Sequence, residues 1–281
     1  MDLTNKCGVK RTLSTRLSRR MSQFKKIKSI EESKSKSVSP ENFSVVATHI
    51  TNISSLQLNV NRLNKSFFDQ PCIQLAKCLL GKILVRMLPT GNILRGKIVE
   101  TECYLGTFDV ASHSYMGKRT ERNEAMFLEP GTAYVYSIYG MYFCFNISSQ
   151  GEGSAVLIRA IEPLENIHIM KDFRLTKRKN SDLKPKTVMK DKELCNGPSK
   201  LCLAFQITKS FNKIDLCTSE DLWLEDGLSI PDCDIIACKR IGIESAGEEW
   251  ANKPLRFYVK DCIWVSVRNK AAEELHLKDM S

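Results

Sequence analysis

The sequence has little of what marks the common metal, disulfide and membrane classes of protein. Its 281 residues include only four histidines and no HExxH motif, so it has no zinc-hydrolase signature. Its eleven cysteines are odd in number, form no CxxC pair, and in places lie within apolar runs, as Cys144 does between Phe143 and Phe145. This pattern predicts buried free thiols in a reducing compartment. No apolar run approaches the roughly 20 residues that span a bilayer. We therefore expect no metal, no cofactor and no membrane association.

Acidic and aromatic residues are scarce at the start of the chain. Residues 1–40 contain eleven Lys or Arg, eight Ser, three acidic residues and a single aromatic residue. Such a segment cannot bury enough apolar surface to offset the entropy of ordering. We predict a disordered, basic, Ser-rich tail over residues 1–62 and one folded domain over residues 63–275. The composition of the tail is compatible with nuclear targeting, with non-specific DNA contact and with a mitochondrial presequence. The alternative is a solvated tail that carries no targeting signal.

The rest of the chain predicts more strands than helices. The net charge of +10 and the pI of about 9.0 favour a polyanionic partner. Because neighbouring strands can pair locally, we predict an α+β domain with a mostly antiparallel, curved sheet, flanking helices and a protruding β-hairpin. Helices are expected at 73–80, 164–173 and 197–205, a mobile basic loop at 176–192, and strands at 82–88, 93–102, 132–147 (a hairpin), 155–161, 255–260 and 263–267.

The hairpin predicted at 132–147 has an unusual tip. Four of the seven tyrosines lie in residues 131–146, and the turn falls at Tyr139-Gly140. A tyrosine held in water at a turn suggests a probe that enters a stacked base step. The alternative is a core hairpin with one exposed ring.

Several polar residues lie within apolar strands. Glu100, Glu102 and Tyr104 share one strand face, where a carboxylate beside a tyrosine could act as a general base; the alternative is a solvated face. If Arg159 is buried, it needs an acidic or phosphate partner. That partner would belong either to a functional site or to a structural ion pair. Asn146 is either bonded to backbone or directed into a pocket.

Two further signals follow the acidic strand. His113 alone is more often structural than catalytic, and the run at 118–123 is either a phosphate-binding loop or ordinary surface charge. Together, an aromatic slot, a carboxylate, an arginine, a projecting tyrosine and a basic rim are what a base-flipping enzyme requires.

The motifs around these residues resemble one family. Residues 99–106, the spacing to His113, and residues 130–147, 156–164, 196–201 and 253–259 are similar to the alkyladenine (3-methyladenine) DNA glycosylase family, over roughly residues 66–270. The resemblance implies a metal-independent, monofunctional glycosylase domain that acts on double-stranded DNA. It implies release of 3-methyladenine, 7-methylguanine, hypoxanthine and ethenoadenine, with an abasic site left behind.

The resemblance also implies a role for individual residues. Glu102 would activate the attacking water, with Arg159 and the carbonyl of Ile241 holding it. The pocket walls would be Tyr104, His113 and Tyr136, and Asn146 would crowd the purine 2-position against guanine. Tyr139 would intercalate beside Met141, and DNA-facing positions would be Arg119, Thr120, Arg122 and Lys200.

Some positions depart from the family pattern. Cys103 and Ser112 replace expected small residues, and Glu121 is acidic within the DNA-facing loop, which affects substrate preference rather than chemistry. Two other functions stay open, a catalytically silent sensor of modified bases and a formyltransferase-like small-molecule enzyme. We expect a monomer in the nucleus, with the mitochondrion as the alternative.

Overall fold

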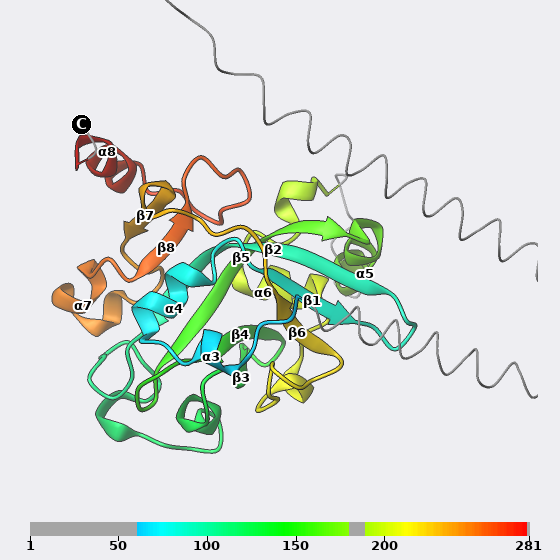
Figure 1. Ribbon diagram of the computed structural model, residues 1–281, viewed down its shortest axis with the longest axis horizontal. Coiled ribbons are helices and arrows are strands. Elements are labelled where there is room, and N and C mark those ends of the chain that lie inside the picture. The colour runs from blue at the N-terminus through cyan, green and yellow to red at the C-terminus, as the bar shows by residue number, and fades with distance from the viewer. Residues whose placement is uncertain (1–60, 180–188, 280–281) are drawn as a thin grey trace, which may run out of the picture. The chain divides into compact units, whose positions relative to one another are not determined.

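A computed structural model describes residues 61–179 and 189–279 (Figure 1). These residues belong to one compact unit that begins at Asn61. The predicted tail, residues 1–62, lies outside the described residues except for its last two positions. There Arg62 forms an isolated bridge with Glu225, and Leu63, the first residue after the tail, donates a backbone hydrogen bond of 2.9 Å to Leu224.

The described chain folds around one curled antiparallel sheet of eight strands, as predicted. Six strands are hydrogen-bonded in the order β3-β4-β5-β2-β1-β6, and β8 pairs with both β2 and β7. The strands are β1 (Ile83–Met87), β2 (Ile93–Tyr104), β3 (Ala133–Ile138), β4 (Tyr142–Ser148), β5 (Ala155–Glu165), β6 (Leu222–Glu225), β7 (Ile235–Cys238) and β8 (Arg256–Val259).

The longest strand, β2, changes partner along its length. Its first half pairs with β1 and its second half, from Glu100 to Glu102, pairs with β8, while β5 follows it throughout on the other edge. The register with β5 shifts around Glu100, and Arg159 is left without a residue opposite it. Such bulges bend a strand and redirect side chains, so the sheet curls where the acidic residues lie.

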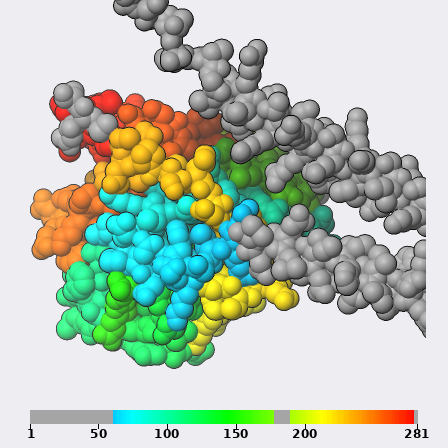
Figure 2. All heavy atoms as spheres, in the orientation of Figure 1, coloured from blue at the N-terminus to red at the C-terminus, as the bar shows by residue number. Residues whose placement is uncertain are grey.

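Helices cover this sheet on the sides that carry its apolar residues. They are α3 (Lys65–Phe68), α4 (Cys72–Cys78), α5 (Ile167–Lys179), α6 (Pro198–Ala204), α7 (Glu248–Asn252) and α8 (Lys270–Asp279). Helix α4 lies against β2, where the Thr101 hydroxyl donates to the carbonyl of Ala76 at 2.9 Å. In the space-filling view the cyan segment around α4 fills the centre of one face, and the yellow-to-red C-terminal third borders it (Figure 2).

One close approach explains a glycine in β2. A Cβ at Gly96 would lie 2.3 Å from a methyl carbon of Ile161 and 3.0 Å from the ring of Phe205, the residue that ends α6. The helix can therefore pack onto the sheet only where β2 has no side chain.

Several predicted elements differ from the structure. Residues 263–267 form turns instead of a strand, β5 continues through residues 164–165, and α5 extends into the predicted loop as far as Lys179. The short strands β6 and β7 and the helix α8 were not predicted. Residues 180–188 of the predicted loop lie outside the described residues.

The ten cysteines in the described ranges are all free, and six are buried, as predicted. Across the same ranges no helix is long and apolar enough to cross a membrane. The described residues also contain no cluster of metal-ligating side chains.

Candidate functional site

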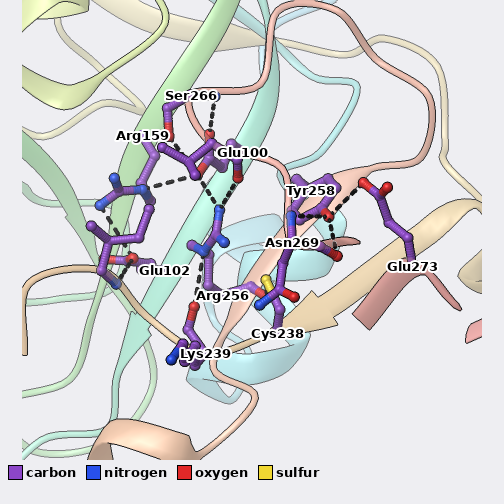
Figure 3. Close-up of polar contacts among 12 residues, drawn as sticks. Glu100, Glu102, Arg159, Cys238, Lys239, Arg256, Tyr258, Ser266, Asn269 and Glu273 are labelled. Carbon is purple, nitrogen blue, oxygen red and sulfur yellow. Dashed lines mark hydrogen bonds and ion pairs between the residues drawn. The ribbon is translucent and has the colours of Figure 1, made fainter. Parts of the chain in front are cut away.

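Two glutamates of β2, Glu100 and Glu102, reach the same arginine, Arg159 (Figure 3). Glu100 and Glu102 are both fully buried, so the alternative of a solvated face is wrong. Both contact Arg159 of β5, whose position at the bulge directs its guanidinium between them. Burial of a carboxylate is tolerated only when it is paired and hydrogen-bonded, and both are.

Glu102 has three donors around its carboxylate. Its Oε1 accepts from the backbone N–H of Ile241 at 2.9 Å and lies 3.1 Å from Nη1 of Arg159. Its Oε2 accepts from the hydroxyl of Tyr104 at 3.1 Å. Burial raises the pKa of Glu102 above its usual value, and Arg159 and the Ile241 amide oppose that rise. A carboxylate with a raised pKa that stays paired suits a general base.

An aromatic cavity of about 170 Å³ is lined by Tyr104, whose hydroxyl bonds to this carboxylate. The ring of His113 meets Tyr136 edge-on at 4.7 Å between centroids, and its Nδ1 lies 2.8 Å from the hydroxyl of Tyr134. The walls come from Tyr104, Ala111, His113, Met126, Tyr134, Tyr136, Asn146, Gly242 and Ile243. The structure thus brings all four predicted base-binding residues together, and one of them, Tyr104, bonds to Glu102.

Burial sets the protonation of this cavity. It lowers the pKa of His113, with Arg122 and Lys118 acting in the same direction, so the imidazole is neutral at neutral pH. Burial also raises the pKa of Tyr104 and of Tyr136. With Nδ1 occupied by Tyr134, a neutral His113 has Nε2 left for a ligand.

Asn146 closes one side of the cavity. Its side chain is 3% exposed and donates from Nδ2 to the carbonyl of Tyr134 at 3.0 Å. Both possibilities raised by the sequence therefore apply, because the side chain is bonded to backbone and also lines the cavity.

The hairpin tip projects as the sequence predicts. Tyr139 is 89% exposed, and it and Gly140 both have positive φ, of 52° and 69°. The N–H of Met141 donates to the carbonyl of Ile138 at 3.3 Å and closes the turn. A bulky residue in the left-handed region is strained, and neither the strain nor the exposure of Tyr139 is offset by packing.

The loop from 118 to 123 is fixed beside this hairpin. Arg122 lies 5.2 Å from the ring of Tyr136 and donates to the carbonyl of Ser137 at 3.3 Å. Arg119 lies 3.6 Å from Glu124 and over the ring of Phe127. Thr120 bonds to Asn123 at 2.9 Å, and Lys200, on α6, bonds to Asn196 at 2.8 Å.

Sequence reasoning missed three groups that shape the site. Tyr134 forms part of the cavity, and Asn123 is 2% exposed and donates to the carbonyls of both His113 and Lys118. Arg240 forms a buried bidentate salt bridge with Asp109, with Nη1–Oδ2 and Nη2–Oδ1 distances of 2.6 and 2.9 Å. Its guanidinium also lies against the ring of Tyr104. Of these groups, only Asn123 gave a signal in the sequence, because it is a polar residue at the end of a charged run. Its hydrogen-bond partners, however, are visible only in the fold.

The arrangement can hold a planar aromatic ligand against a buried carboxylate. Tyrosine faces attract cations, and the neutral histidine can exchange hydrogen bonds with a heterocycle. An open basin of about 480 Å³ lies next to it between Arg122, Tyr136 and Lys213, and presents basic side chains at the approach.

Comparisons with known proteins identify the relatives of this chain. The family model described as "Methylpurine-DNA glycosylase (MPG)" matches residues 66–263. A human protein named DNA-3-methyladenine glycosylase is 54% identical over 79% of this chain and 73% of its own length. The mouse protein of that name is 51% identical over 79% of this chain and 66% of its own length. A Clostridium botulinum protein named putative 3-methyladenine DNA glycosylase is 50% identical over 73% of this chain and 98% of its own length.

Proposed function

The chain belongs to the methylpurine-DNA glycosylase family, and from that premise we propose how its residues release a damaged purine from DNA. Its activity is that of a DNA-3-methyladenine glycosylase, an enzyme of base excision repair. The observation that carries the mechanism is the buried, triply bonded Glu102, which accepts a hydrogen bond from Tyr104 in the wall of an aromatic cavity.

Glu102 is the general base of the proposed reaction. Its carboxylate takes a proton from a water molecule, which attacks the anomeric carbon as the N-glycosidic bond breaks. The bonding electron pair leaves with the purine, so a cationic methylpurine departs as a neutral base and a neutral purine takes up a proton from solvent. The negative charge of Glu102 also stabilises the positive charge that develops on the sugar. Arg159, which contacts Glu102 at 3.1 Å, and the backbone of Ile241 help to orient the carboxylate and the water.

The cavity selects the base. Tyr104 and Tyr136 stack on the purine, and cation–π attraction favours 3-methyladenine and 7-methylguanine by about 1–2 kcal/mol when desolvated. Neutral lesions such as hypoxanthine and ethenoadenine depend more on hydrogen bonds near His113. Asn146, at 3% exposure, is too confined to move aside for the 2-amino group of guanine.

Tyr139 completes the proposed flipping step. Extruding a nucleotide costs a few kcal/mol, least for damaged bases. The Tyr139 ring, inserted where the base was, restores roughly 1–3 kcal/mol of stacking, with Met141 beside it. Arg119, Thr120, Arg122 and Lys200 then lie along the DNA backbone. We further propose that residues 63–275 form the catalytic domain, that it acts as a monomer, and that the enzyme works in the nucleus.

The test is base release by the Glu102→Gln variant on a duplex with one hypoxanthine. Glutamine keeps the shape but cannot take the proton, so we expect lesion binding to persist while release falls by roughly a hundredfold or more. Glu162→Gln removes a carboxylate from the neighbouring strand, where it pairs with Lys97, and should release base at the wild-type rate. Release by Glu102→Gln at the rate of this control would remove Glu102 from the catalytic role.

A further inference from the structure

The buried Glu100 is bonded more heavily than its catalytic neighbour. Its Oε1 accepts from Arg159 Nε at 3.0 Å, from Arg256 Nη1 at 2.8 Å and from the Ser266 hydroxyl at 2.8 Å (Figure 3). Its Oε2 accepts from the backbone N–H of Ser266 at 2.6 Å. All four bonds are made to groups of the protein itself, so any effect of Glu100 on base release is exerted through these partners.

Arg159 connects this carboxylate to the proposed general base. Its Nε faces Glu100 while its Nη1 lies 3.1 Å from Oε1 of Glu102. A guanidinium is planar and rigid, so fixing one of its nitrogens fixes the direction of the others. Glu100 therefore determines from which side Arg159 meets Glu102.

Two of the donors come from beyond the region that the family model matches, which ends at residue 263. The segment that follows is tied down in several places. Arg256 donates to the carbonyl of Val267 at 2.8 Å, and the hydroxyl of Tyr258 accepts from the N–H of Asn269 at 2.9 Å and donates to Glu273 at 2.8 Å. The backbone at Ser266 is thus held against Glu100 by contacts of the residues that follow it in the chain.

We propose that Glu100 is a positioning residue for base release, which holds Arg159 against Glu102, and that the C-terminal segment 264–279 completes the active site through Ser266. This inference rests on the proposed function. The alternative is a purely structural ion cluster, and it makes a different prediction about the acid side of the pH–rate profile.

The sign of the pH effect follows from the charges around Glu102. Arg159 on β5 and Arg240 before Ile241 are cationic, and Glu100 is the neighbouring anion on β2; Tyr104 on β2, Cys144 on β4 and Cys238 on β7 are neutral at neutral pH. An anion nearby disfavours ionisation of Glu102 and so raises its pKa. The Arg159 cation acts in the opposite direction and more strongly, because it lowers the pKa of Glu102. If Glu100 holds Arg159 in place, Glu100→Gln loosens Arg159 as well, so the pKa of Glu102 should rise and the acid limb should move to higher pH. In a purely structural cluster Arg159 stays in place and only the anion is lost, so the acid limb should move to lower pH.

The experiment measures single-turnover base release from the hypoxanthine duplex across the acid and neutral range, using the full chain. For Glu100→Gln we expect a maximum rate roughly ten- to a hundredfold lower, because Arg159 loses its anchor. We expect the acid limb to be displaced to higher pH, with lesion affinity unchanged. A displacement to lower pH would show that Arg159 keeps its place without Glu100 and would overturn the inference. Glu162→Gln, on the adjacent strand, should show the wild-type profile.

A second variant covers the case in which Glu100→Gln does not fold. Ser266→Ala keeps all charges and the backbone N–H but loses one donor, so the maximum rate should fall several-fold, and Ser266→Thr should restore it. Profiles of Glu100→Gln and Ser266→Ala that match Glu162→Gln would overturn the inference. Absence of release by the wild type would instead count against the proposed function, and the pKa of Glu102, followed by carboxyl-carbon NMR in the free protein, would then test the inference alone.

Discussion

Tyr139 combines two costs that the fold does not recover. Its ring is 89% exposed and its backbone has a φ of 52°. For a residue other than glycine, asparagine or aspartate this conformation costs roughly 1–2 kcal/mol. A side chain that is retained despite both costs is best explained by what it contacts when DNA is bound.

Tyr139→Asn tests this explanation, because asparagine tolerates the left-handed conformation and has no ring to insert. We expect the free energy of unfolding in urea to rise by about 0.5–1 kcal/mol, and base flipping, followed with a fluorescent base analogue beside the lesion, to weaken. Leu228→Asn, at a residue 70% exposed in the segment after β6, should leave flipping unchanged. If flipping by Tyr139→Asn equals that of this control, Tyr139 is an ordinary turn residue.

At the residue scale the sequence predicted side chains better than their partners. Glu102, Arg159 and His113 follow from motifs that are continuous in the chain. The contacts that support these residues could not be predicted from the sequence. Arg240 and Asp109 are 131 residues apart in the chain, and Ser266 and Glu100 are 166 residues apart. Such contacts arise only when the sheet brings distant segments together.

At the scale of elements, the loop that carries His113 depends on one buried side chain. Asn123 accepts from the N–H and hydroxyl of Thr120 at 2.7 and 2.9 Å, and donates to the carbonyls of His113 and Lys118 at 2.9 and 2.7 Å. It therefore couples the wall of the cavity to the basic loop, in place of regular secondary structure.

Asn123→Ala should loosen both ends of this loop together. Loss of these bonds in a buried site should lower the free energy of unfolding by about 2–4 kcal/mol, measured in urea. Affinity for a lesion duplex should fall more than affinity for undamaged DNA, since the cavity wall moves. Asn212→Ala is a suitable comparison, because Asn212 makes one bond of 2.9 Å to the backbone of Val135. An equal loss of both affinities in Asn123→Ala would contradict the coupling.

The wrongly predicted strand at 263–267 has a physical explanation. The three residues that would share one face of a strand are not buried together, because Ile263 and Val267 are exposed while Val265 is buried. The backbone there donates from Ser266 to Glu100 and accepts at Val267 from Arg256, so it serves the buried charges instead of a neighbouring strand. The strands β6 and β7 have four residues each, too few for a periodic signal in the sequence.

For the whole molecule, the positive charge is unevenly distributed along the chain. Residues 1–40 carry eleven basic and three acidic residues, so eight of the ten excess positive charges lie there. The α+β class and the antiparallel sheet could be predicted because neighbouring strands pair. The contribution of the tail to DNA binding could not be predicted in this way, because it depends on which partner the tail contacts.

A chain that starts at residue 61 should separate the two contributions. We expect it to release base at the wild-type rate under saturating conditions, because the catalytic groups all lie after that point. Its affinity for DNA should fall less steeply with salt than that of the full chain, because fewer counterions are released. Identical salt slopes, measured by fluorescence anisotropy, would show that the tail does not contact DNA.

The most direct test of the central claim is base release by the purified wild-type chain in EDTA, from a duplex with a single hypoxanthine. The account predicts free hypoxanthine and an alkali-labile abasic site, with no strand cleavage by the protein itself. Tight lesion-specific binding without release, repeated on ethenoadenine and 7-methylguanine, would contradict it and would identify a sensor of damaged bases instead.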